Sequence, residues 1–84
     1  MKVAIIGAGN MGSAIARGLA QGYLVQGHEI VMSNPTNGKL EKLKADFPNI
    51  KTTNNNMDAA SNADIVIAAV KPWLIEEVLE PLRL

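Results

Sequence analysis

The sequence predicts an α/β fold: a partial, doubly wound parallel sheet of about four strands, in the order 3-2-1-4, that ends before the later strands. Short β-branched runs alternate with helical patterns along the whole chain, which is typical of this fold class. A glycine-rich turn follows the first of these runs directly. The composition agrees, because 48% of the residues are hydrophobic but Trp, Tyr and Phe occur once each, as in an aliphatic core between a sheet and its helices.

The first predicted strand and helix form one βα unit. The strand covers residues 3–6 and the helix covers residues 11–23. At the i, i+4, i+8 spacing, the helix has a large apolar stripe of Met11, Ile15 and Leu19 and a small stripe of Gly12, Ala16 and Ala20. The small stripe predicts that this helix lies close against the sheet, because small side chains allow a short distance between packed elements.

The rest of the chain alternates in the same way. Residues 65–70 are apolar on both faces, which predicts a central, buried strand. Pro72 suits the first turn of a final helix, under which we expect Trp73 to pack. The other predicted elements are a strand over residues 29–33, a short helix marked by Leu40, Leu43 and Phe47, a weak strand over residues 50–53 and a helical turn over residues 57–62.

Composition and charge exclude several classes of function. Eight basic and eight acidic residues cancel, so no electrostatic footprint indicates nucleic acid or an anionic membrane as a partner. Cysteine is absent, which excludes disulfides and thiolate chemistry and is compatible with the cytoplasm, where we expect the protein. No stretch approaches the roughly 18 apolar residues of a membrane span. No nucleophile–base pair or metal-ligand cluster stands out, so we predict neither a catalytic residue nor a metal site in this chain.

The clearest binding motif is the turn after the first strand, Gly7-Ala8-Gly9-Asn10-Met11-Gly12. In a dinucleotide fingerprint each glycine has a physical role. Gly7 permits the tight turn, Gly9 lets a pyrophosphate approach the backbone, and Gly12 lets the helix pack closely on the strand. The start of the helix adds unpaired N–H groups and a partial positive charge. The motif therefore predicts a Rossmann-type dinucleotide site.

The carboxyl end of the second strand consists of uncharged residues, namely Ser33, Asn34, Pro35 and Thr36. Sites that bind NAD place an Asp or Glu there for the ribose hydroxyls, whereas Glu29 lies at the opposite end of this strand. A carboxylate would repel the 2′-phosphate of NADP, but hydroxyls, an amide and the N–H groups of the turn could accept it. Lys39 and Lys42 could add attraction, although lysines on a surface helix are more typically only solvated. We therefore expect NADP(H) as the cofactor, with NAD(H) possible.

Two further segments are candidates for cofactor contact. The turn after the fourth strand should face the same crevice, because ligands of open α/β sheets bind beyond the carboxyl ends of the strands, but an ordinary strand-to-helix connection would look the same. Asn56 could bond a ribose or adenine edge, or it could serve its own backbone. His28 precedes the second strand, away from the crevice, which argues against a catalytic role. The residues of the turn after the fourth strand are Ala69, Val70, Lys71 and Pro72.

With these residues assembled, the chain resembles the N-terminal domain of the pyrroline-5-carboxylate reductase family over all 84 residues. The glycine motif is common to many dehydrogenases, but Ala-Val-Lys-Pro at the end of the fourth strand is much more selective. The segments that carry the resemblance are residues 6–12, residues 14–18, residues 33–35, Asn56 and residues 63–72.

The resemblance implies reduction of a cyclic imine to L-proline by hydride from NADPH, or from NADH in some members. It also implies that substrate and dimerisation surfaces lie mostly in a C-terminal helical domain, so the longer protein would be a homo-oligomer with a small-molecule substrate. Residues 1–84 would then be its N-terminal NAD(P)-binding domain, inactive alone, which fits a sequence that stops without the further strands of a doubly wound sheet. The matching cofactor residues are Ile6, Gly7, Ala8, Gly9, Asn10, Met11, Asn34, Asn56, Ala69, Val70, Lys71 and Pro72.

Two alternatives stay open at the level of the sequence. The glycine motif also fits a related NADP-dependent reductase, such as a deazaflavin-dependent NADP oxidoreductase or a β-hydroxyacid dehydrogenase. A non-catalytic nucleotide-binding module would fit if 84 residues were the whole protein. The residues indicate the cofactor, whereas the substrate rests on the resemblance.

Overall fold

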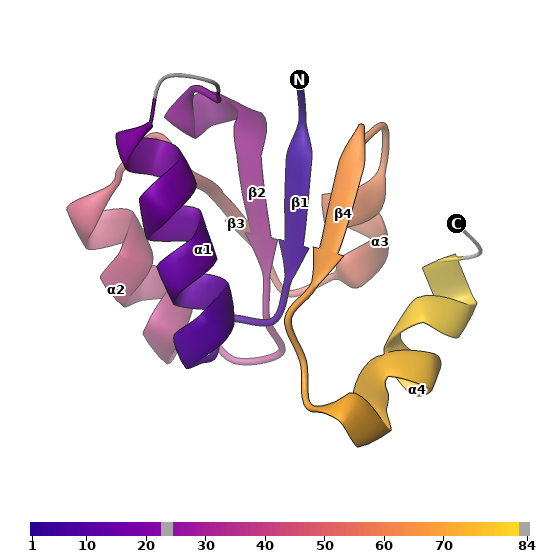
Figure 1. Ribbon diagram of the computed structural model, residues 1–84. Helices are drawn as coiled ribbons and strands as arrows, with labels where there is room; N and C mark the ends of the chain where they lie inside the picture. Colours follow the sequence, from indigo (N-terminus) through magenta and orange to yellow (C-terminus); the bar gives the residue numbers. More distant parts are fainter. Residues whose placement is uncertain (23–24, 83–84) are drawn as a thin grey trace.

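Strands and helices alternate along the chain, and the four strands of the described part join in one parallel sheet (Figure 1). The computed structural model describes residues 1–22 and 25–82. In chain order the elements are β1 (Val3–Ile6), α1 (Asn10–Gln21), η1 (Gly27–Glu29), β2 (Ile30–Ser33), α2 (Gly38–Asp46), β3 (Lys51–Thr53), α3 (Asn56–Ala60), β4 (Ile65–Ala68), η2 (Pro72–Leu74), α4 (Ile75–Leu79) and η3 (Glu80–Leu82). The predicted α/β class is confirmed.

The strand order β3-β2-β1-β4 is the predicted one, and because all the pairs are parallel, the carboxyl ends of the four strands lie at one edge of the sheet. Ile6 at the end of β1 lies beside Ser33 of β2 and beside Ala68 of β4. Just past the strand ends, Gly7 N–H donates to the Ser33 carbonyl at 2.8 Å. Ala69 N–H donates to the Ile6 carbonyl, also at 2.8 Å. The loops after β1, β2 and β4 therefore start side by side.

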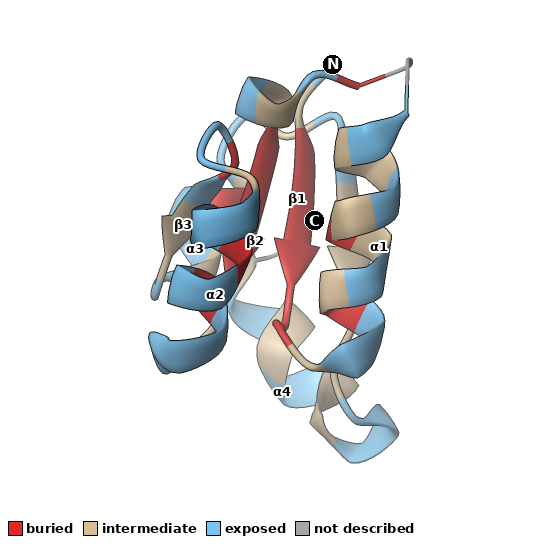
Figure 2. Cartoon of the chain, turned by 90° about the vertical axis from the view of Figure 1, so that its left-hand side faces the viewer, coloured by how far each residue is buried: buried red, intermediate tan, exposed pale blue. Residues whose placement is uncertain are grey.

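β1 is buried over its whole length (Figure 2), because apolar side chains cover it on both faces of the sheet. Successive residues of a strand point to opposite faces. Val3 and Ile5 pack with residues of α1 and α2 on one face. Ala4 and Ile6 pack on the other face, with Ala59 of α3. This double cover explains why the sequence of β1 is a continuous apolar run.

The small stripe of α1 brings the helix close to the strand, as predicted. Gly12 and Ala16 are its buried residues, and a Cβ on Gly12 would lie 1.9 Å from the Gly7 carbonyl oxygen. The large apolar stripe does not start at Met11 as predicted, because this residue is 69% exposed at the start of the helix. The predicted end of the helix at Tyr23 lies outside the described residues.

The strand predicted over residues 65–70 covers residues 65–68, and the prediction that it is buried is wrong. β4 lies last in the strand order, and Ile65 is 44% exposed. Within the described residues no strand pairs with its outer edge, so its apolar side chains are only partly covered. Trp73 does not pack under the final helix either, because it is 76% exposed. An apolar run indicates that a strand can be buried, but its burial also requires other elements that pack against it.

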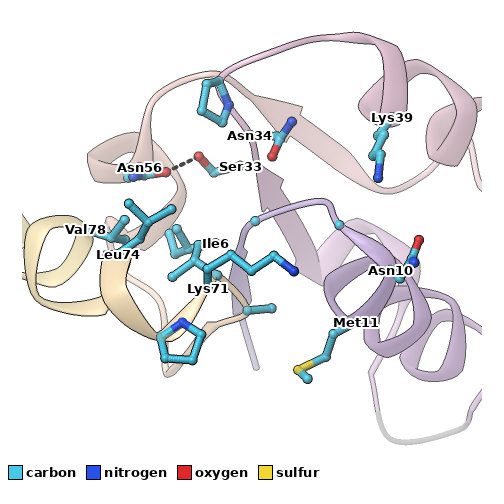
Figure 3. A pocket seen from close by; sticks show the side chains of 16 residues that line it. Ile6, Asn10, Met11, Ser33, Asn34, Lys39, Asn56, Lys71, Leu74 and Val78 are labelled. Carbon is cyan, nitrogen blue, oxygen red and sulfur yellow. Dashed lines mark hydrogen bonds between the residues drawn. The ribbon is translucent and has the colours of Figure 1, made fainter.

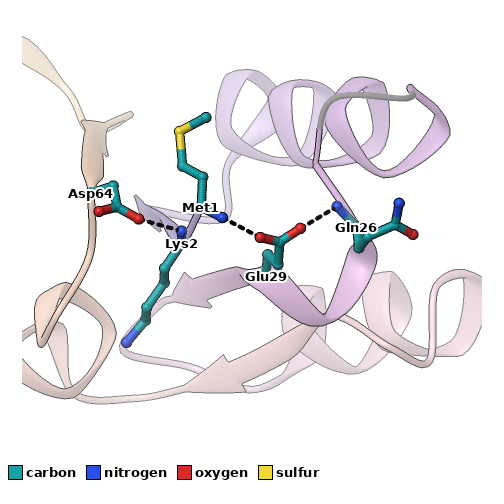
Figure 4. A network of polar contacts seen from close by, with 5 residues as sticks. All are labelled: Met1, Lys2, Gln26, Glu29 and Asp64. Carbon is teal, nitrogen blue, oxygen red and sulfur yellow. Dashed lines mark hydrogen bonds and ion pairs between the residues drawn. The ribbon is translucent and has the colours of Figure 1, made fainter.

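Polar contacts close the amino edge of the sheet (Figure 4). Glu29 accepts a hydrogen bond from Gln26 N–H at 2.9 Å and pairs with the α-ammonium of Met1, while Lys2 N–H donates to Asp64 at 2.8 Å. These bonds hold Glu29 in η1, so β2 begins one residue later than predicted. The bond with the Met1 ammonium, and then that from Gln26, lowers the pKa of Glu29. The same pairing raises the pKa of the Met1 amino group.

The described helices are short, and α1 has 12 residues. None of the helices in residues 1–22 and 25–82 has the length and apolar character needed to cross a membrane. In the same ranges, no group of three or more His, Cys, Asp or Glu side chains is placed to hold a metal ion.

Candidate cofactor site

A cavity of about 670 Å³ lies at the carboxyl edge of the sheet (Figure 3). It is bordered by the glycine loop (residues 7–12), the β2 turn (residues 34–37) and the β4 turn (residues 69–72), and Leu74 of η2 and Val78 of α4 form an apolar wall. Segments far apart in the sequence thus form one surface. The lining residues are Ile6, Gly7, Gly9, Asn10, Met11, Ser33, Asn34, Pro35, Lys39, Asn56, Ala69, Val70, Lys71, Pro72, Leu74 and Val78.

The three glycines of the loop have different surroundings. Gly7 has a φ of +105°, in the left-handed region, and a Cβ there would lie 2.5 Å from the Ala69 carbonyl oxygen. Gly12 packs against the loop itself. A Cβ on Gly9 would meet nothing within 4 Å, so the backbone is open to the cavity at this position. The loop therefore has room for a Cβ, or for a ligand, at Gly9 but not at Gly7 or Gly12. This pattern fits the roles predicted for the three glycines.

The amino end of α1 forms part of the cavity wall through Asn10 and Met11. Its N-cap, Gly9, has no side-chain acceptor, and the first turn carries no acidic residue. The first bond of the helix runs from Ser13 N–H to the Gly9 carbonyl at 2.9 Å, so the N–H groups before Ser13 have no acceptor within the helix. Together with the helix dipole, these groups favour an anion at this end of the cavity.

Asn34 ties the β2 turn to the glycine loop. Its side-chain oxygen accepts from Ala8 N–H at 3.1 Å, and its amide nitrogen donates to the carbonyl and the hydroxyl of Thr36, both at 3.2 Å. Asn54 holds the turn from β3, donating to the Asn34 carbonyl at 3.0 Å and to the side-chain oxygen of Asn37 at 2.7 Å. These bonds fix the shape of the turn in advance, which reduces the entropy lost when a ligand binds.

Ser33 and Asn56 form a polar contact beside the cavity. Ser33 is fully buried, and its hydroxyl donates to the side-chain oxygen of Asn56 (Figure 3). The N-cap of α3 is the preceding residue, Asn55, which accepts from Met57 N–H at 2.8 Å and from Asp58 N–H at 3.1 Å. Asn55 therefore serves the backbone of α3, and the Asn56 side chain is left to face the cavity.

The charged residues of the cavity lining are Lys39 and Lys71, and no acidic residue of the described chain lines it. Lys39 belongs to the first turn of α2, and Lys71 to the β4 turn. His28 and Glu29 lie in η1, before β2 and so at the opposite edge of the sheet, as predicted. The cavity thus favours an anionic ligand.

Residues 2–84 match the family described as "NADP oxidoreductase coenzyme F420-dependent". The chain belongs to this family. A curated relative, the pyrroline-5-carboxylate reductase of Vibrio alginolyticus, is 43% identical over 83 residues, which are 98% of this chain and 29% of the relative. Pyrroline-5-carboxylate reductase 3 of Mus musculus is 37% identical over 78 residues, which are 93% of this chain and 28% of the relative. The chain thus spans less than a third of the length of these relatives.

A solved structure shares the fold of this chain. It is the pyrroline carboxylate reductase of Plasmodium falciparum with NADP bound, and it is 26% identical to this chain with a TM-score of 0.80. The match covers 98% of this chain and 28% of that one. The predicted partial Rossmann-type sheet is therefore confirmed by both the strand order and the likeness.

In this member of the family, most of the residues predicted to contact a cofactor line the cavity. Ala8, Gly12 and Thr36 do not line it, because the first two are buried in the packing of the glycine loop and Thr36 is bonded within the β2 turn. Leu74 and Val78 line it without having been predicted. Apolar residues at helical spacing predict core packing, and the only available signal was their place just after the β4 turn.

Proposed function

We propose that residues 1–84 are the NADP(H)-binding domain of a pyrroline-5-carboxylate reductase. The observation that carries the proposal is the cavity at the carboxyl edge, where an open glycine, a free helix start and two lysines surround a space whose described lining has no acid. These groups suit the phosphates of a dinucleotide. Identity to pyrroline-5-carboxylate reductases, and the NADP bound to the Plasmodium falciparum protein, support the same assignment.

The cavity suggests a place for each part of the cofactor. The pyrophosphate lies at Gly9 and the start of α1, where the backbone is open. The adenosine ribose and its 2′-phosphate lie beside the β2 turn, since no carboxylate stands at the end of β2 to repel them. Ser33 contributes through its bond to Asn56, rather than by direct contact of its buried hydroxyl with the phosphate. The β4 turn then borders the nicotinamide half.

The proposed reaction is reduction of 1-pyrroline-5-carboxylate to L-proline. When bound in this cavity, NADPH would supply the hydride for the imine carbon, and the imine nitrogen would take up a proton. This chain binds and orients the cofactor, and none of its residues is assigned as the proton donor. The substrate, the homo-oligomeric state and the cytoplasmic location stay predictions about a longer protein. The match to this chain covers 29% of the Vibrio alginolyticus relative.

A second candidate is favoured by the family description, which names coenzyme F420. In such an oxidoreductase the hydride passes between NADP(H) and a deazaflavin. Both candidates use the same cofactor site and differ in the second substrate. The names of the curated relatives favour the cyclic imine.

Two measurements test the proposal. Calorimetric titration of this chain with NADP+ and with NAD+ should show tighter binding of NADP+, and tighter binding of NAD+ would overturn the cofactor preference. The longer protein that contains these residues should oxidise NADPH only when 1-pyrroline-5-carboxylate is added. Oxidation that depends on oxidised coenzyme F420 instead would support the second candidate.

A further inference from the structure

Met11 lies in the first turn of α1 and lines the cavity. Its side chain is largely exposed, although it is apolar. Figure 3 shows the side chain leaving the start of α1 with its sulfur at the far end, away from the helix. The packing of α1 does not account for this position, because the helix buries Gly12 and Ala16 instead. The thioether is therefore accessible to small molecules that enter the cavity.

The four methionines of the chain differ in exposure and in place. Met1 and Met57 are also exposed, but neither lines the cavity. Met32 is fully buried in β2. The sequence contains no cysteine, so the thioethers are its only sulfur atoms. Among them, Met11 is exposed inside the cavity, and Met57 is similarly exposed outside it.

An exposed thioether reacts with peroxide to form a sulfoxide. The sulfur is oxidised by two electrons and bonds to one peroxide oxygen. The O–O bond breaks, and the other oxygen leaves as water with both hydrogens of the peroxide. The product is a polar side chain, and its new oxygen accepts hydrogen bonds.

At Met11 this new acceptor would lie at the start of α1, where donors are free. The N–H groups before Ser13 have no acceptor within the helix. The oxygen of a sulfoxide carries partial negative charge, which the helix dipole favours at this end. It would therefore compete with the phosphate of a ligand for the same N–H groups.

We propose that Met11 is an oxidation site, through which peroxide lowers the affinity of the cavity for a dinucleotide. The inference rests on the proposed function, because it concerns the ligand assigned to the cavity. A dinucleotide at the glycine loop covers Met11, so the bound protein is oxidised more slowly than the free protein. Methionine sulfoxide reductases convert the sulfoxide back to the thioether, which makes the loss of affinity reversible.

The test is treatment of this chain with dilute hydrogen peroxide, followed by peptide mass spectrometry and calorimetric titration with NADP+. Met11 and Met57 should each gain one oxygen atom, whereas the buried Met32 should not. Conversion of Met11 should weaken NADP+ binding about tenfold, because a hydrogen bond to the phosphate is lost. Methionine sulfoxide reductases for both epimers should restore the affinity. Saturating NADP+ during the treatment should slow the conversion of Met11 but not that of Met57.

Two variants assign the effect to one sulfur atom. Met11→Leu removes the thioether at similar volume and should lose no affinity on treatment. Met57→Leu, the matched control, should lose affinity as the unaltered chain does. Each variant is compared with itself before and after treatment, so the effect of the substitution on binding does not enter the comparison. Treated and untreated protein should melt alike, because the converted side chains are exposed.

Three results would overturn the inference. The NADP+ affinity could stay the same after Met11 is converted, or Met11→Leu could lose as much affinity on treatment as the unaltered chain. Met11 could also resist peroxide while Met57 is converted. In each case NADP+ binding by the untreated chain would leave the proposed function standing. If the untreated chain bound no dinucleotide, both proposals would fail.

Discussion

The two edges of the sheet use their charged groups in opposite ways. At the amino edge the charged groups bond within the protein: the α-ammonium of Met1 pairs with Glu29, and Asp64 accepts from Lys2 N–H (Figure 4). At the carboxyl edge Lys39 and Lys71 line a cavity and take part in no ion pair among the residues described. The polar groups that do bond there, such as Asn34, hold loops together. The difference indicates that one edge stabilises the fold and the other keeps its charge for a ligand.

The largest effect, on stability, should come from Gly12→Ala, because Gly12 packs directly against the backbone of the glycine loop. The new Cβ would lie 1.9 Å from the backbone oxygen of Gly7, so we expect the free energy of unfolding to fall by about 3 kcal/mol or more. Gly18→Ala is the matched control in the same helix, because its Cβ meets nothing within 4 Å and should add about 1 kcal/mol of stability. Urea denaturation measures both. Equal stability of the two variants would contradict the packing of α1 described above.

Gly9→Ala should separate binding from folding at the carboxyl edge. A Cβ on Gly9 meets nothing within 4 Å, and the φ of −69° suits alanine, so stability should not change. In the proposed complex the methyl group obstructs the pyrophosphate, and both NADP+ and NAD+ should bind about thirtyfold more weakly. Titration and urea denaturation of the same sample measure the two properties. Full affinity in this variant would place the pyrophosphate away from the glycine loop.

Asn34→Asp should change which cofactor the carboxyl edge prefers. The carboxylate can still accept from Ala8 N–H, but it puts a negative charge beside the proposed 2′-phosphate. NADP+ affinity should fall about tenfold while NAD+ affinity holds or rises, because a carboxylate accepts ribose hydroxyls. Asn37→Asp adds the same charge to the same turn at a residue that does not line the cavity. If titration shows the same loss for both variants, the effect is one of general charge and not of contact.

Much of the fold could be predicted from the sequence because the signals are local. The apolar run of β1, the glycines after it and the small stripe of α1 each determine a contact between neighbours in the chain. The exposure of β4 could not be predicted in this way. Whether Ile65 is covered depends on a partner for the strand, and no spacing within residues 65–70 reports on that partner.

In the candidate site, too, the residues marked by local sequence motifs could be predicted, and those that depend on the fold could not. The glycine loop and the β4 turn are each continuous in the sequence, so each can be predicted as a motif without knowing that the two meet in space. Lys39 and Leu74 each look like ordinary helix residues until the strand order brings their loops together. The bond from Ser33 to Asn56 joins β2 to α3, and only the fold could show that this hydroxyl is already used.

The smallest effect should appear at the amino edge, as a dependence of stability on pH. The Met1 ammonium, and then Gln26 N–H, holds the pKa of Glu29 below its ordinary value, so the ionised carboxylate stabilises the fold. This contribution is present above about pH 4.3, the pKa of an unfolded glutamate, and is lost as the pH falls through the lower pKa of the folded state. Since the pair lies near the surface, salt should weaken it and the change in melting temperature should be small.

Glu29→Gln should therefore lose part of its stability at about pH 6 and little at about pH 3, where the carboxylate is protonated in any case. Glu76→Gln, an exposed acid in the first turn of α4 without an ion pair in the described ranges, is the control and should lower the melting temperature at about pH 6 by less than Glu29→Gln does. Titration with NADP+ at about pH 6 should give the same affinity for both variants, because Glu29 lies at the edge opposite the cavity. A Glu29→Gln protein that kept its stability but lost cofactor affinity would contradict the inference that the amino edge stabilises the fold while the carboxyl edge binds the ligand.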